Sequence, residues 1–66
     1  MLSMIEALAH SMDEKFGCPY EIHEGKVAVI VTVVGERHVE AATWLARGLA
    51  GTASHDFASS TARFDL

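Results

Sequence analysis

Disulfide bonding within the chain is excluded, because the sequence contains one cysteine, Cys18. Long apolar runs are also missing: the longest, Val27 to Val34, is interrupted by Thr32 and is too short to cross a bilayer. No basic residue precedes an apolar stretch near the N-terminus, so the sequence shows no signal peptide. From these absences we expect a cytoplasmic protein that makes no contact with a membrane.

Positive charge is scarce at the beginning of the chain. Residues 1–24 contain five acids against one base, Lys15. The later residues contain four acids and four bases, so the formal net charge of −4 lies entirely in the first third. Such segregation affects which partners a protein meets rather than how it folds. Because phosphate binding needs a cationic face, we expect no direct contact with nucleic acid.

The length of 66 residues predicts one small domain, residues 1–66. Half of the residues are hydrophobic and 21% are charged, a balance that excludes an intrinsically disordered tail. A chain this short buries only about 60% of the surface that its unfolded state exposes, so a partner or a second copy would add useful stability.

Hydrophobic spacing predicts two helices. Residues 4–16 repeat apolar side chains with helical period, follow the capping-box spacing of Ser3 and Glu6, and end before Gly17. Residues 36–50 predict a second helix that ends at Gly51. Its inner face is predicted to carry Val39, Ala42, Ala46 and Leu49.

Three strands are predicted. Residues 20–23 and 26–34 flank Glu24-Gly25, which can form a two-residue hairpin turn, and residues 61–66 alternate apolar and polar side chains. Residues 52–60 show no readable pattern. The prediction is an α+β fold in the order α-β-β-α-β, with a three-stranded, mainly antiparallel sheet and two helices on one face. In this register the covered face carries Tyr20, Ile22, Val27, Val29, Val31 and Val33, and the other face becomes apolar at Ile30 and Val34.

The acids of the first helix are predicted to share one side. Glu6, Asp13 and Glu14 fall in one arc together with His10. In the last turn the helix dipole disfavours an exposed anion by roughly 0.3–1 kcal/mol, so Asp13 and Glu14 oppose the local electrostatics. Ordinary surface charge and a partner-binding anionic face both remain open interpretations. The candidate binding residues are Glu6, Asp13, Glu14, Glu21 and Glu24.

Trp44 is a further candidate partner-binding residue. It lies about 140° around the helix axis from Val39, on the side predicted to face outward. Its helical neighbours Ala41 and Gly48 are small, and tryptophan is enriched at binding hot spots. The alternative is that the chain end covers Trp44, for instance with Phe57.

No pattern indicates catalysis, a metal site or a cofactor. His55-Asp56 is not accompanied by a serine in a nucleophile elbow, and the histidines and Cys18 lack metal-ligand spacing. Cys18 follows a helix C-terminus, where the dipole disfavours a thiolate. We therefore expect a protein that is not an enzyme and binds no metal or cofactor.

With its length, its plain α/β pattern and the anionic run from Asp13-Glu14 through Glu21 and Glu24, the chain resembles the anti-CRISPR proteins, small phage-encoded inhibitors of bacterial defence. Several of these are acidic single domains that occlude DNA-binding surfaces. The resemblance implies a viral protein in the bacterial host cytoplasm that acts as a DNA mimic, inhibiting a CRISPR effector subunit stoichiometrically. These inhibitors share no motif, so no residue roles are carried over.

Two functions are therefore weighed. The first is an acidic inhibitor that occludes the nucleic-acid-binding surface of a basic partner protein. The second is a structural or assembly module that forms a homodimer through an exposed apolar surface, either Trp44 or the open face of the sheet. Salt separates them, because charge-driven binding weakens with ionic strength and apolar burial does not.

Overall fold

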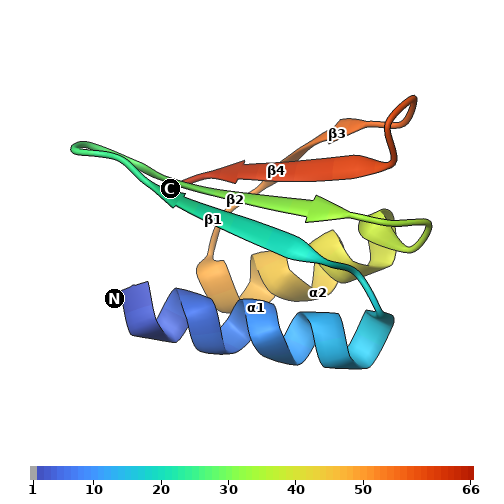
Figure 1. Cartoon of the computed structure of the whole chain (residues 1–66), viewed down its shortest axis with the longest axis horizontal. Helices are drawn as coiled ribbons and strands as arrows, with labels where there is room; N and C mark the ends of the chain where they lie inside the picture. The colour runs from blue at the N-terminus through green and yellow to red at the C-terminus, as the bar shows by residue number, and fades with distance from the viewer. Residues whose placement is uncertain (1) are drawn as a thin grey trace.

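The computed structural model describes residues 2–66, which form two helices on one face of a four-stranded antiparallel sheet (Figure 1). The predicted α+β class and the placement of both helices on one side are confirmed. The predicted number of strands is wrong by one. In chain order the elements are α1 (Leu2–Phe16), β1 (Tyr20–Glu24), β2 (Val29–Val34), α2 (His38–Leu49), β3 (Ala53–Asp56) and β4 (Thr61–Asp65).

Helix α1 follows its apolar period, with Ile5, Ala9 and Met12 buried. It includes Leu2 and Ser3, so the predicted capping box is wrong: Ser3 lies inside the first turn instead of before it. The predicted end is confirmed. Gly17 has a φ of 67°, a left-handed conformation that glycine adopts without strain, and its N–H donates to the carbonyl of Asp13 at 2.7 Å.

The β1–β2 hairpin turns two residues later than predicted. Gly25 donates its N–H to the Ala28 carbonyl at 2.8 Å, so the loop consists of Lys26 and Val27, and Val27 is 98% exposed. His23 consequently lies opposite Ile30 instead of Lys26. The shift is even, so the side chains of β2 keep the predicted faces.

The missing strand is β3, which lies within the segment that showed no pattern. It pairs antiparallel with β4, and β4 pairs antiparallel with β2, which gives the order β1-β2-β4-β3. Its sequence is Ala-Ser-His-Asp, and Ala53 is its only half-buried residue. An edge strand that contributes so little to the core lacks the alternation by which strands are recognised.

Helix α2 is rotated relative to the prediction. Its buried residues are His38, Ala41, Ala42 and Leu45, whereas Val39 is 42% exposed. The reason is a close helix–helix approach: a β-carbon at Gly48 would lie 3.0 Å from both terminal methyl groups of Leu8 in α1. Gly48 of α2 therefore faces α1. The helix ends at Leu49 and is capped by Ala50, which adopts the left-handed conformation (φ 55°) directly before the predicted glycine.

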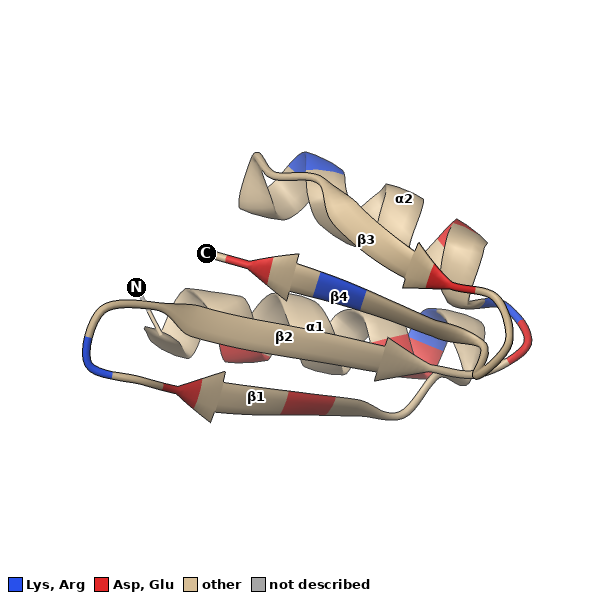
Figure 2. Cartoon of the chain, turned by 90° about the horizontal axis from the view of Figure 1, so that it is seen from above, with Lys and Arg blue, Asp and Glu red and all other residues tan. Residues whose placement is uncertain are grey.

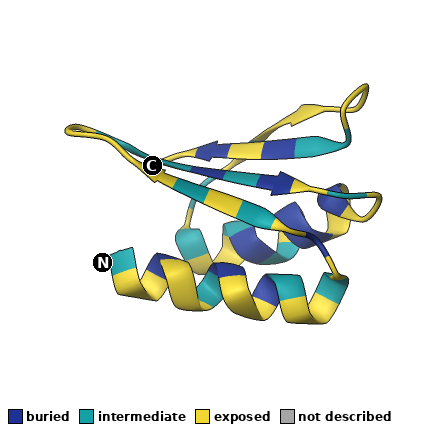
Figure 3. Ribbon diagram, viewed as in Figure 1, coloured by how far each residue is buried: buried dark blue, intermediate teal, exposed yellow. Residues whose placement is uncertain are grey.

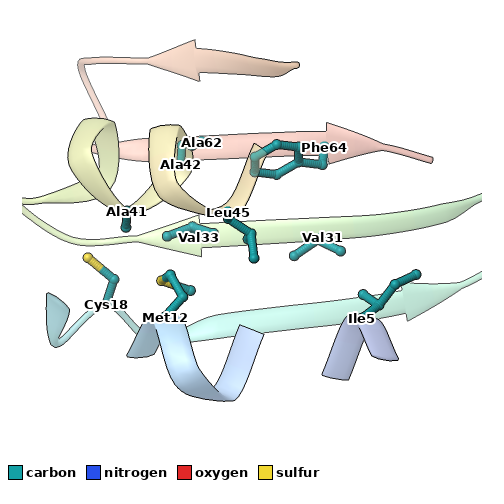
Figure 4. Close-up of a cluster of buried hydrophobic side chains, with 10 residues drawn as sticks. All are labelled: Ile5, Met12, Cys18, Val31, Val33, Ala41, Ala42, Leu45, Ala62 and Phe64. Atoms are coloured by element: carbon teal, nitrogen blue, oxygen red, sulfur yellow. The ribbon is translucent and has the colours of Figure 1, made fainter. Parts of the chain in front are cut away.

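The core lies between the helices and the covered face of the sheet. Figure 3 shows burial concentrated there, and Figure 4 shows the side chains of both layers pointing toward one another. Side chains from both layers are wholly buried, among them Met12, Val31, Val33, Leu45 and Phe64. The opposite face of the sheet has no covering element in the described part of the chain (Figure 1).

Candidate protein-binding surface

Helix α1 carries its acids on the side away from α2. Leu8 lies against Gly48 of α2. At 100° per residue, Glu6 and Asp13 are roughly 140–160° around the helix from Leu8. Glu6 and Glu14 are exposed and Asp13 is half-buried. The predicted arc therefore faces outward beside the sheet.

Strand β1 adds the other two acids. Glu21 and Glu24 are both exposed. Figure 2 shows acidic segments on β1 and on α1, which packs against β1. We use the name acidic edge for these carboxylates of α1 and β1: Glu6, Asp13, Glu14, Glu21 and Glu24.

The acidic edge differs from the rest of the surface in its pairing. Of the four acids elsewhere, two are neutralised locally: Arg37 donates to both carboxylate oxygens of Glu40, and Arg63 donates to Asp65 at 3.1 Å. The guanidinium of Arg37 lowers the pKa of Glu40 through these hydrogen bonds. Glu36 and Asp56 have no lysine or arginine partner among residues 2–66. Within residues 2–66, the acidic edge makes no ion pair with lysine or arginine; its one contact of this kind joins Glu14 to His10 at 3.5 Å.

Trp44 was predicted to face outward, but it does not project into solvent. It is half-buried, packs against the core, and its ring meets that of Phe16 edge-on with centroids 6.3 Å apart. Arg37 stacks on the same Phe16 ring, with its guanidinium carbon 5.0 Å from the centroid. The small neighbours of Trp44 do admit another backbone, but that backbone is α1 of the same chain. A role of Trp44 in partner binding stays a prediction.

A ring cluster lies near the other edge of the sheet. The Nδ1 of His38 donates to the Gly35 carbonyl at 2.9 Å, since a carbonyl can only accept. The buried Nε2 finds no hydrogen-bond partner in the described residues. His55 and Phe57 lie against His38, with ring centroids 5.6 and 5.5 Å away. The sequence did not single out His38, because its burial depends on the rotation of α2. Across residues 2–66, no three potential ligands gather closely enough to hold a metal ion.

Two shallow hollows lie outside the acidic edge. An apolar one of about 110 Å³ is lined by Met4, Ile5, Gly48, Leu49 and Leu66, where the start of α1 meets the end of α2. A polar one of about 260 Å³ lies on the β3–β4 hairpin, beside Ser54, Asp56 and Arg63. Neither contains a predicted site residue.

Cys18 is buried beneath Gly35, where a β-carbon would come within 3.1 Å of the sulfur. Burial raises the pKa of the Cys18 thiol, because the thiolate would lose its hydration. This environment does not favour a nucleophile.

The raised thiol pKa predicts a loss of stability in alkali. The folded state retains the thiol proton where the unfolded state, with a pKa of about 8.5, has released it. The unfolded state then binds fewer protons, so the free energy of unfolding falls as pH rises through that range. Urea denaturation between about pH 7 and 10 should show a steeper decline for the native chain than for Cys18→Ala. Parallel curves for the two proteins would contradict the burial of a neutral thiol.

No family model, no curated protein and no solved structure matches the chain. In the described residues, neither helix has the length and apolar character needed to cross a membrane.

Proposed function

We propose that this chain is a small acidic protein that binds a basic, nucleic-acid-binding partner and occludes its nucleic-acid surface. The observation that carries the proposal is the unpaired acidic edge: Glu6, Asp13, Glu21 and Glu24 lie on two adjacent elements without a lysine or arginine partner among residues 2–66. A negative surface that is not neutralised within its own chain is complementary to a surface rich in lysine and arginine. The protein acts stoichiometrically and catalyses no reaction.

The partner class follows from the charge. A protein groove that binds DNA collects lysine and arginine to neutralise phosphates, and carboxylates can pair with the same side chains. Glu21 and Glu24 are spaced by roughly 10 Å along the extended strand, and Glu6 and Asp13 by a similar distance along the helix. Because side chains alternate along a strand, Glu21 projects from the open face and Glu24 from the covered face. The acidic edge therefore presents well-separated charges on the helix and on both faces of β1. It is suited to blocking several basic side chains rather than to reproducing a whole duplex.

The resemblance to anti-CRISPR inhibitors gives this proposal its concrete form. A CRISPR effector subunit that recognises duplex DNA has the required basic groove, and the encounter takes place in the cytoplasm of a bacterial host.

The alternative, a homodimer, is favoured by one feature: the apolar hollow between the helix ends, where Met4 is 58% and Leu66 is 37% exposed. Exposed apolar side chains around a hollow suit association with a second copy.

Reciprocal exclusion tests the occlusion mechanism. The immobilised protein is incubated with a bacterial lysate with and without nuclease, and the captured protein is then presented with duplex DNA. We expect DNA and this chain to displace one another, since two ligands of one site exclude each other. Binding should weaken steeply as salt is raised. A ternary complex of partner, DNA and this chain at saturating concentrations would rule out occlusion, and a salt-independent self-association in size-exclusion chromatography would favour the homodimer.

A further inference from the structure

We propose that the acidic edge is completed by an added β-strand: an extended segment of the basic partner pairs with the free edge of β1. The inference rests on the proposed function and specifies how the partner is held. The observation behind it is the position of β1 at the end of the strand order β1-β2-β4-β3. Figure 2 shows β1 along the border of the sheet with no element beyond it.

The hydrogen-bond register shows which backbone groups are free. Gly25 and Ala28 form one hydrogen-bonded pair, and the N–H of Val34 donates to the carbonyl of Pro19 at 3.0 Å. Antiparallel strands alternate between bonded and non-bonded pairs, so Glu21 and His23 direct their backbone groups toward β2. The intervening residues Tyr20, Ile22 and Glu24 direct their N–H and C=O groups away from the sheet. A row of backbone donors and acceptors thus lies at the acidic edge and can accept a further strand.

The side chains around this row define the occupant. On the covered face, Tyr20 and Ile22 are half-buried and leave apolar surface for an apolar neighbour. On the open face, Glu21 is exposed and has no lysine or arginine partner among residues 2–66. The acids of α1 lie on the other side of the strand, in the helix layer (Figure 1). A guest strand with apolar side chains toward Tyr20 and Ile22, and with lysine or arginine toward Glu21, matches the two faces of β1. A second copy is disfavoured, because it would bring two sets of five acids together.

The other edge of the sheet lacks this combination. Strand β3 has four residues, of which only Ala53 is half-buried, and one acid, Asp56, whose carboxylate accepts a hydrogen bond from the N–H of Ala58. Neither an apolar strip nor an unpaired negative row accompanies its free backbone groups. The exposed acids and the half-buried apolar side chains therefore favour β1 over β3 as the edge that accepts the added strand.

Amide exchange measured by NMR distinguishes strand addition from simple charge contact. The probe is a peptide of about seven residues with alternating lysine and valine, and the control replaces lysine by glutamate. In the free protein the amides of Tyr20, Ile22 and Glu24 should exchange rapidly, while those of Glu21 and His23 are already protected by β2. With the lysine–valine peptide bound, the three outward amides should slow by about tenfold or more. The glutamate peptide should leave them unchanged.

A matched pair of variants tests the backbone contact directly. Ile22→Pro and Ile22→Ala both remove the isoleucine side chain, but only proline removes the outward N–H, a change that edge strands tolerate. Peptide affinity should be several-fold lower in Ile22→Pro than in Ile22→Ala. If the proline variant does not fold, the same question is put with peptides N-methylated at alternate amides: one methylation set should abolish binding and the other should not.

The outcomes separate this inference from the function on which it rests. Binding of the lysine–valine peptide with unchanged exchange at Tyr20, Ile22 and Glu24 overturns strand addition and leaves a charge-only contact. Absence of peptide binding at low salt overturns strand addition too, while the proposed function stands or falls on the exclusion of DNA. Concentration-dependent protection of the three amides without peptide would place a second copy at the edge and overturn the basic occupant.

Discussion

Replacing Phe64 by alanine is expected to cause the largest loss of stability of any single truncation in this protein. Phe64 is wholly buried in β4, an inner strand that pairs with both β2 and β3. Removing a buried phenylalanine side chain costs about 3–5 kcal/mol. A domain of this length has a total stability of roughly 3–10 kcal/mol, so a single cavity at this position uses a large part of it.

Circular dichroism during thermal unfolding measures the effect. The matched control is Phe57→Ala, because Phe57 is 70% exposed at the β3–β4 turn. That variant should lose no more than about 1 kcal/mol, since the Phe57 ring is mostly exposed and packs at the surface against His38 and His55. Equal losses in the two variants would mean that Phe64 is not the centre of the core.

Charge reversal at the end of α1 is expected to abolish partner binding while leaving the fold intact. Asp13→Lys combined with Glu14→Lys replaces two acids of the acidic edge by bases, which then repel a basic partner. The same change removes two anions from the last turn of α1, where the helix dipole disfavours them by roughly 0.3–1 kcal/mol each. The double variant should therefore unfold at the same temperature as the native protein or slightly above it.

The control makes the same change of net charge elsewhere. Glu36→Lys with Asp65→Lys alters two exposed acids, one in the turn before α2 and one in β4, neither of them in the acidic edge. Binding to the captured partner should survive in this control. If it disappears in both double variants, binding depends on overall charge and not on the acidic edge. If the Asp13, Glu14 variant still binds at low salt, these acids are not part of the contact.

The sequence predicted the elements whose side chains enter the core from a regular period. Helix α1 ends at Gly17 as expected, and Tyr20, Ile22, Val31 and Val33 share the covered face because an even error in register preserves the face of each residue. Strand β3 was missed since only Ala53 contributes to the core. β3 is a strand because it pairs with β4. Hydrogen bonding to another strand leaves no pattern in the sequence of β3 itself.

The site was predicted to a similar extent. The outward arc of Glu6, Asp13 and Glu14 follows from helical geometry alone. The error at Trp44 arose because the buried face of α2 is set by the close approach of Leu8 to Gly48, a contact between distant segments. The unpaired backbone groups of β1 could not be predicted either, because they depend on the strand order and on the position of the hairpin turn.

The alternation along β1 separates the residues that hold this domain together from those that meet its surroundings. Tyr20 and Ile22 pack against the core, while Glu21 and His23 are exposed. Substitutions at the second pair can accumulate with small effects on folding, whereas changes at the first pair are constrained by packing. If β1 binds a partner as proposed, its specificity can therefore change quickly on an unchanged scaffold. Every residue type except proline keeps the backbone N–H and C=O groups. The pairing of these groups with a guest strand would therefore be preserved while the side chains change.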